Sequence, residues 1–124
     1  MPGPESKLIV VIDDHEAMQD SLRDLIESVG FDVLCFGSAK AFLESDLRQK
    51  AACLIVDIRM PKMSGLELQA RLKEEGHNVP IIFISAFEDP EMRAQAIAQG
   101  AVEFLQKPFD HRLLLKILGG ALGG

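Results

Sequence analysis

The sequence predicts an α/β protein built on a doubly wound parallel sheet, with helices on both faces in a three-layer sandwich. Five short apolar runs alternate with segments long enough to hold a helix each, and these segments carry helical periodicity or capping residues. Parallel strands need long, right-handed crossover connections, so the helices cover both faces of the sheet. A chain of 124 residues is long enough for one such domain with its own core.

The predicted strands are apolar runs, three of them nearly continuous, as expected for strands that are covered on both faces. In chain order the five runs are LIVVI at 8–12, DVLCF at 32–36, CLIV at 53–56, IIFIS at 81–85 and AVEFL at 101–105. The two cysteines, Cys35 and Cys53, lie inside such runs and are not spaced for zinc. We therefore expect both to be small core residues.

The segments between these runs carry helix signals. One apolar stripe has the spacing of a single helix face and precedes Gly30; its members are Met18, Leu22, Leu25, Ile26 and Val29. The other predicted helices run from Ser38 through Leu43, from Ser64 or Gly65 to near Gly76, from Asp89-Pro90 to Gly100, and from Asp110 through Leu113, Leu114, Ile117 and Leu118. The terminal GGALGG is expected to weaken the last helix and to be a tail or an engineered boundary.

Composition excludes several classes of protein. A content of 48% hydrophobic and 26% charged residues is typical of a soluble globular domain, and no apolar run is long enough to cross a membrane. The net charge of -6 argues against direct binding of nucleic acid but is compatible with a metal cation. The first ten residues show no signal peptide, so we expect a cytoplasmic location. The turn DDHEAM has no glycine, which argues against nucleotide-binding loops.

Polar side chains lie at or just beyond the ends of four predicted strands, where doubly wound sheets bind their ligands. They are Asp13, Asp14, Asp57, Ser85 and Lys107. Three carboxylates brought close together repel one another, which raises a pKa or calls for a cation such as Mg²⁺. With that charge offset, one carboxylate can attack a phosphoryl group whose oxygens are held by a lysine ammonium and a hydroxyl.

Each of these residues also has an ordinary structural interpretation. One of the acids at 13 and 14 can cap the following helix, and Asp57 can be a cap or turn acid. Ser85 can be a strand-end hydroxyl, and Lys107 a solvated surface lysine. A second consecutive acid has no such explanation, so the combination favours a site. The three histidines, His15, His77 and His111, are interpreted as loop or helix-start residues outside that site.

Four motifs in order, VIDDHE, LIVDIRMPKMSGLEL, IIFISA and EFLQKPF, resemble the receiver domain of two-component response regulators, in wording most like the FixJ-like branch. The resemblance covers about Leu8 to Leu118. It implies a flavodoxin-like (βα)5 fold with strand order 2-1-3-4-5. It also implies one receiver domain over residues 1–124, with its core at about 8–118, and we expect this to be the N-terminal part of a longer regulator.

The resemblance assigns roles to the acidic residues. Asp57 matches the phosphoacceptor, which takes a phosphoryl group from a sensor histidine kinase. Asp14 and Asp57 match direct Mg²⁺ ligands, Asp13 acts largely through water, and Arg59 contributes its backbone carbonyl to the ion.

Further roles follow for the switch. Ser85 matches the switch hydroxyl, Lys107 the family's lysine, and Phe104 the switch aromatic, although a plain core or surface phenylalanine is the alternative. The Lys107-Pro108 peptide bond is usually cis in this family, and a cis bond before proline is energetically accessible.

Two positions that vary in the family bear on rate. Arg59 places a long cation beside the site. Phe87 puts an apolar wall where other members carry a polar group that can orient water. We therefore expect an acyl phosphate of at least moderate lifetime.

The resemblance implies a phosphorylation switch that repacks the face formed by the fourth helix, fifth strand and fifth helix. Its partner would be a second receiver in a homodimer or an attached DNA-binding output domain. One alternative is a Mg²⁺-dependent phosphatase with an aspartate nucleophile, which is disfavoured because Arg59 stands where that class needs a second acid. The other is a receiver-like interaction scaffold that is not phosphorylated, which is disfavoured because all five site positions are chemically intact.

Overall fold

The computed structural model describes residues 7–87 and 89–122. The elements, in chain order, are β1 (Leu8–Ile12), α1 (Glu16–Glu27), β2 (Asp32–Phe36), α2 (Ala39–Glu44), β3 (Ala51–Asp57), α3 (Gly65–Glu74), β4 (Ile81–Ser85), α4 (Pro90–Ala98), β5 (Glu103–Gln106) and α5 (His111–Ala121). All neighbouring strands are parallel, in the order β2-β1-β3-β4-β5. The predicted fold class and strand order are confirmed.

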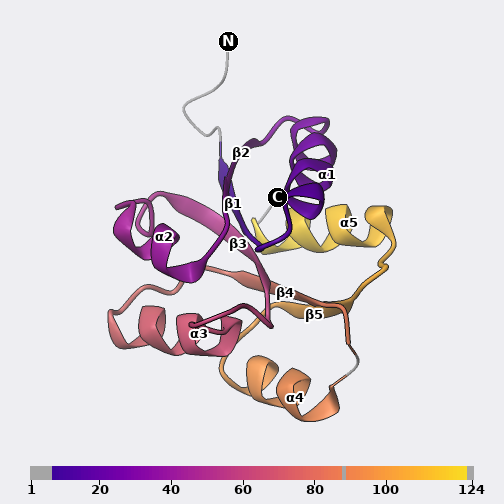
Figure 1. The fold of residues 1–124 in the computed structure, drawn as a ribbon. Coiled ribbons are helices and arrows are strands. Elements are labelled where there is room, and N and C mark those ends of the chain that lie inside the picture. The colour runs from indigo at the N-terminus through magenta and orange to yellow at the C-terminus, as the bar shows by residue number, and fades with distance from the viewer. Residues whose placement is uncertain (1–6, 88, 123–124) are drawn as a thin grey trace.

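The sheet separates two apolar cores, as the predicted three-layer sandwich requires. Figure 1 shows α1 and α5 on one face and α2, α3 and α4 on the other. Alternate residues of β1 serve the two layers: Ile9 and Val11 pack toward α1 and α5, while Val10 and Ile12 pack toward the other three helices. Burial on both faces explains why the central strands are continuous apolar runs rather than alternating ones.

Side-chain caps begin four of the five helices. The side chains of Ser38, Ser64, Asp89 and Asp110 each accept a hydrogen bond from a first-turn backbone N–H. Ser64, rather than Gly65, caps α3, and it forms a reciprocal capping box with Glu67. The predicted starts of these helices are therefore confirmed.

The structure differs from the sequence-based prediction at the ends of some helices and strands. Helix α1 ends at Glu27, and Val29, predicted on its buried face, is 48% exposed in the turn closed by Gly30 at φ +96°. Strand β5 begins at Glu103 rather than at residue 101, because the N–H of Ala101 still bonds to the end of α4. Strand β3 extends beyond the predicted 53–56 at both ends and includes Asp57 itself.

The last helix continues through both glycines of the segment GGALGG, as far as Ala121. Each glycine disfavours a helix by roughly 1 kcal/mol relative to alanine. Leu114 and Leu118 are fully buried on the sheet, and this packing holds the helix over the glycines, although Leu113 on the predicted stripe is 44% exposed. Residues 123–124 of this segment, and residues 1–6 of the stretch expected to lack a signal peptide, lie outside the described part of the chain.

The two cysteines differ because their strands differ. Cys53 on central β3 is fully buried, as predicted, whereas Cys35 on the edge strand β2 is only half-buried. Burial raises the pKa of the Cys53 thiol to about 12, so this side chain is a neutral core residue near neutral pH. Among the described residues, no helix is long and apolar enough to cross a bilayer.

Candidate functional site

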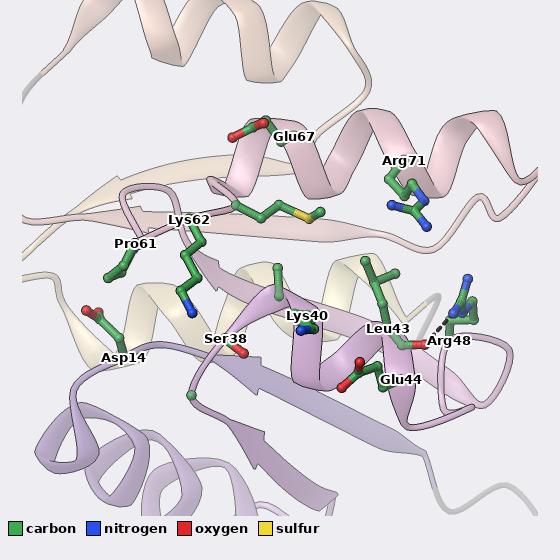
Figure 2. A pocket seen from close by; sticks show the side chains of 13 residues that line it. Asp14, Ser38, Lys40, Leu43, Glu44, Arg48, Pro61, Lys62, Glu67 and Arg71 are labelled. Atoms are coloured by element: carbon green, nitrogen blue, oxygen red, sulfur yellow. Dashed lines mark hydrogen bonds between the residues drawn. The ribbon is translucent and has the colours of Figure 1, made fainter.

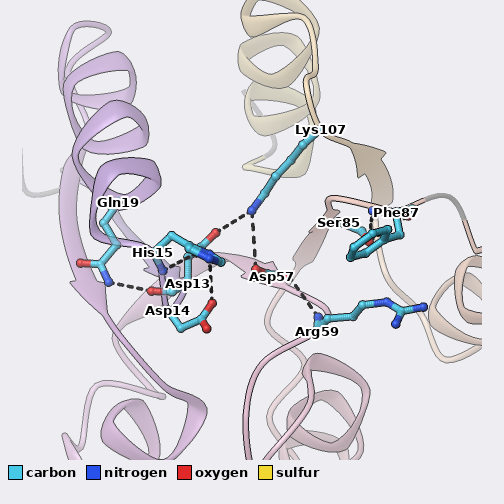
Figure 3. Close-up of polar contacts among 9 residues, drawn as sticks. All are labelled: Asp13, Asp14, His15, Gln19, Asp57, Arg59, Ser85, Phe87 and Lys107. Carbon is cyan, nitrogen blue, oxygen red and sulfur yellow. Dashed lines mark hydrogen bonds and ion pairs between the residues drawn. The ribbon is translucent and has the colours of Figure 1, made fainter.

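The carboxyl ends of β1, β3 and β5 bring three predicted site residues into direct contact. The Nζ atom of Lys107 lies 3.1 Å from Oδ2 of Asp13 and 3.5 Å from Oδ2 of Asp57, so one ammonium pairs with two carboxylates (Figure 3). The backbone N–H of Lys107 bonds to the carbonyl oxygen of Ser85 at 2.6 Å, which ties the ends of β4 and β5 together. The Lys107-Pro108 peptide bond is cis.

The carboxylates at this edge are buried to different degrees. Asp13 is fully buried and Asp57 is 5% exposed, whereas the side chain of Asp14 is 30% exposed and opens toward solvent. Burial raises the pKa of the Asp57 carboxyl. The backbone N–H of Arg59 and the Lys107 ammonium oppose this rise in pKa, while the charges of Asp13 and Asp14 add to it. One lysine does not neutralise three carboxylates.

This donor set fits a divalent cation. One carboxylate oxygen each from Asp13, Asp14 and Asp57, together with a ring nitrogen of His15, all lie within 4.8 Å of one another. Carboxylate oxygens are preferred ligands of hard cations, and a bound cation would supply the positive charge that Lys107 alone does not. The sequence-based expectation of converging acids therefore has a geometric basis.

The acids at 13 and 14 do not cap helix α1. The N-cap residue is His15, whose side chain makes no capping bond. Asp13 instead accepts the backbone N–H of His15 at Oδ1, at 2.8 Å, and its own carbonyl accepts a 2.6 Å bond from the side chain of Gln19. The ordinary interpretation as helix caps is wrong for this pair, and Asp13 is held by bonds that orient its carboxylate toward Lys107.

Ser85 is fully buried at the end of β4, but its hydroxyl is occupied by its own loop. Oγ donates to the carbonyl oxygen of Phe87 at 2.9 Å and accepts the backbone N–H of the same residue at 3.1 Å. Among the described residues, no hydrogen bond joins Ser85 to Asp57. The structure therefore places the predicted switch hydroxyl at the site's edge without turning it toward the carboxylate.

Arg59 connects the two loops that flank Asp57. Its backbone N–H donates to Oδ1 of Asp57 at 3.0 Å. Its guanidinium lies 3.1 Å from Oδ2 of Asp89, the N-cap of α4, and 5.2 Å from the ring centre of Phe87, a distance at which the cation and the aromatic face attract. Phe87 is 59% exposed, and its role as an apolar wall beside the site stays a prediction.

Phe104 lies on β5 beside Phe83 of β4 and is 4% exposed. It belongs to the core layer that also contains Ala96 of α4. The alternative of a core phenylalanine therefore describes its position in this structure, and its role as a switch stays a prediction.

Two features of this edge were not predicted from the sequence. His15 contributes Nδ1 to the acidic cluster, although it was interpreted as a helix-start residue outside the site; it is indeed at the helix start and exposed. A cavity of about 780 Å³ also opens between α2 and α3, with Asp14 at one end (Figure 2). Lys40, Lys62 and Arg71 line it. No local pattern signals such a cavity, because its walls come from separate segments.

Fold and site together define a flavodoxin-like α/β domain with an acidic, cation-compatible site at the carboxyl edge of its sheet. Residues 9–119 match the family model of the response regulator receiver domain. The chain therefore belongs to the family of response regulator receiver domains, which are signalling domains, as its motifs predicted.

Relatives include the transcriptional regulatory protein TdiR of Thauera aromatica, which is 45% identical over 92% of this chain and 50% of TdiR. FixJ of Bradyrhizobium diazoefficiens is 39% identical over 92% of this chain and 56% of FixJ. The solved structure of StyR superposes with a TM-score of 0.89 at 40% identity, covering 95% of this chain and 60% of that one. The isolated FixJ-N domain gives a TM-score of 0.86 at 32% identity, covering 96% and 95%. The chain spans about half the length of TdiR and FixJ.

Proposed function

We propose that this domain is the phosphorylation-controlled switch of a two-component regulator and that Asp57 is its phosphoacceptor. The observation that carries the proposal is the contact of one lysine ammonium with two buried carboxylates at the carboxyl edge of the sheet. Among these acids, Asp57 is the one that ends the central strand β3, and relatives in the same family are transcriptional regulators.

The transfer from a sensor kinase phosphohistidine is a single displacement. An oxygen of Asp57 forms the new bond to phosphorus, and the bond from phosphorus to the imidazole nitrogen breaks. The imidazole leaves with the bonding electron pair and takes up a proton. Lys107, already 3.5 Å from Asp57, offsets the negative charge on the transferred group.

The residues that would hold Mg²⁺ are Asp14, Asp57 and the backbone carbonyl of Arg59, with Asp13 acting through water. When bound, the ion offsets the charge of the carboxylates and of the phosphoryl oxygens. Asp13 is already engaged by Lys107 and by the backbone of His15, which is compatible with an indirect role.

The switch would move Ser85 from the backbone of Phe87 to a phosphoryl oxygen. Phe104 would adjust with it, and the face formed by α4, β5 and α5 would change its packing. This face would then pair with a second receiver or act on an attached DNA-binding output domain. Phosphorylation can shift this equilibrium only through contacts that differ between the two arrangements. Arg59 and Phe87 would set the rate of hydrolysis, because Phe87 cannot orient the attacking water.

The test is incubation of the domain with a small-molecule phosphodonor and Mg²⁺, followed by intact mass and size-exclusion chromatography. We expect a mass increase of one phosphoryl group in the wild type and none in Asp57→Asn. An adduct that persists in Asp57→Asn would refute the assignment of the phosphoacceptor. The absence of any adduct in the wild type, with cation binding intact, would instead support an unphosphorylated scaffold.

A further inference from the structure

His15 places a nitrogen atom at the rim of a site whose other donors are all oxygens. Its Nδ1 lies 3.2 Å from Oδ1 of Asp14 and 3.3 Å from Oδ1 of Asp13 (Figure 3). No other histidine belongs to this cluster among the described residues.

The backbone directs this side chain toward the carboxylates. His15 is the N-cap residue of α1, and its N–H is fixed on Asp13. The carbonyl of Asp13 is in turn held by Gln19 from the first turns of α1. The imidazole itself is 71% exposed, so it can adjust its angle without disturbing the core. The residue is therefore anchored at its backbone and adjustable at its ring.

The distances match those between neighbouring ligands of one metal ion. Metal–ligand bonds of about 2.0–2.2 Å place adjacent donor atoms roughly 3.0–3.5 Å apart. The 3.2 Å separation of Nδ1 of His15 from Oδ1 of Asp14, a proposed direct ligand, falls in this interval. Asp13, which would act through water, is within hydrogen-bond distance of the same ring nitrogen at 3.3 Å. The oxygen of Asp57 that completes the set lies within 4.8 Å of the others, so a small inward adjustment of side chains brings the donors around one ion.

An imidazole changes which cations such a site prefers. Mg²⁺ prefers oxygen ligands and keeps several bound waters. Mn²⁺, Co²⁺, Ni²⁺ and Zn²⁺ bind more tightly when one ligand is an imidazole nitrogen, and their affinities for such sites differ in a general order. We propose that His15 is an additional protein ligand at the cation site and that it raises the preference of the site for imidazole-binding transition metals over Mg²⁺.

This inference rests on the proposed function only in taking the acidic cluster as the cation site. It does not depend on phosphorylation. It also has a consequence for the site: a transition metal held by His15 would have one more protein ligand than Mg²⁺, which would leave fewer positions for water.

The experiment compares wild type with His15→Gln and with His111→Gln as a matched control. His111 is the exposed first residue of α5 and lies outside the cluster. Mn²⁺ alone is added at fixed pH, and electron spin echo envelope modulation detects coupling to a ligand ¹⁴N nucleus. We expect this coupling in the wild type and in His111→Gln, and its loss in His15→Gln. Its absence from the wild type, or its loss in the control alone, overturns the proposal.

Competition titrations of Co²⁺ against Mg²⁺ give a second measurement on the same proteins. Losing one ligand should lower Co²⁺ affinity by about tenfold or more, while Mg²⁺ affinity changes by less than about threefold. An equal change for both ions would overturn the role of His15 in selectivity. Circular dichroism checks the fold of each variant. If Mg²⁺ binds but the phosphodonor adds nothing to Asp57, the proposed function fails while this inference is still decided by the nitrogen coupling.

Discussion

The contact between Lys107 and Asp57 predicts a measurable coupling energy in the metal-free domain. The atoms Nζ and Oδ2 are 3.5 Å apart, and the side chains are 15% and 6% exposed. At this distance two unit charges attract by roughly 5 kcal/mol at an effective dielectric constant of about 20, and by roughly 1 kcal/mol in bulk water. Lys107 keeps Asp13 as a partner when Asp57 is neutral, which reduces the difference. We therefore expect a coupling of about 1–3 kcal/mol.

A double-mutant cycle measures this coupling directly. The proteins are wild type, Lys107→Met, Asp57→Asn and the double variant, unfolded by urea with a chelator present. The chain has no tryptophan and no tyrosine, so far-ultraviolet circular dichroism is the suitable probe. Lys107→Met should lower the free energy of unfolding clearly in the wild-type background and less in the Asp57→Asn background.

The reasoning would be refuted if the two substitutions were additive within about 0.5 kcal/mol, the behaviour of independent sites. It would also be refuted if Lys107→Met stabilised the metal-free domain, because three carboxylates would then not need this counter-charge. Addition of Mg²⁺ provides the internal control: a bound cation takes over part of the charge, so the measured coupling should shrink.

Three further predictions concern the loops around Asp57. The raised pKa of Asp57 means that its carboxyl binds a proton more tightly in the folded chain than in the unfolded chain. The free energy of unfolding of the metal-free domain should therefore fall as the pH rises above the ordinary carboxyl pKa of 3.8. Urea titrations at several pH values should show a smaller fall in Asp57→Asn. In Gly65→Ala the new Cβ would lie 2.9 Å from a backbone carbon of the adjoining loop, and this overpacking should lower the free energy of unfolding by about 1–3 kcal/mol. In Gly37→Ala the new Cβ would make only an ordinary 3.9 Å contact with the Gln19 side chain, so the free energy of unfolding should change little. Asp89→Ala should destabilise by about 1 kcal/mol through loss of the α4 cap. Arg59→Ala, which removes the exposed ion pair with Asp89 and the exposed contact with the Phe87 ring, should destabilise by less than about 0.5 kcal/mol, and the reverse order would contradict this division of roles.

The sheet and the convergence of the acids were predictable because they depend on the order of apolar runs and gaps along the chain and not on the geometry of single turns. Continuous apolar runs with helix-length gaps require parallel pairing, and parallel pairing brings the carboxyl ends of strands together. Asp13, Asp57 and Lys107 meet for this reason, although the first and last are 94 positions apart. The resemblance of the motifs to a known family predicted the family and the strand order.

Details that depend on one turn or one helix end were not predictable from such patterns. Val29 continues the apolar stripe of α1, but the helix ends at Glu27 and leaves this side chain in a turn. His15 looks like any helix-start residue, and only the turn at Asp13 brings its ring to the carboxylates. The partner of the Ser85 hydroxyl is likewise decided by the loop that follows β4.

The position of Ser85 links the site to helix α4 in a way that the sequence does not reveal. Its hydroxyl makes two hydrogen bonds to the backbone of Phe87, each worth about 1 kcal/mol net. The same loop is tied by Arg59 to Asp89, which caps α4. Moving the Ser85 hydroxyl toward Asp57 would break both hydrogen bonds, at a cost of roughly 2 kcal/mol, which is a factor of about 30 in the equilibrium constant. A group bound at Asp57 would have to offset this cost before the loop that leads to α4 could change. If Asp57 is phosphorylated as proposed, a charge-assisted hydrogen bond from Ser85 and a closer contact with Lys107, each of comparable size, would give the phosphoryl group enough differential interaction to reverse this balance. On that proposal, one covalent modification at Asp57 would be enough to shift the domain between the two arrangements.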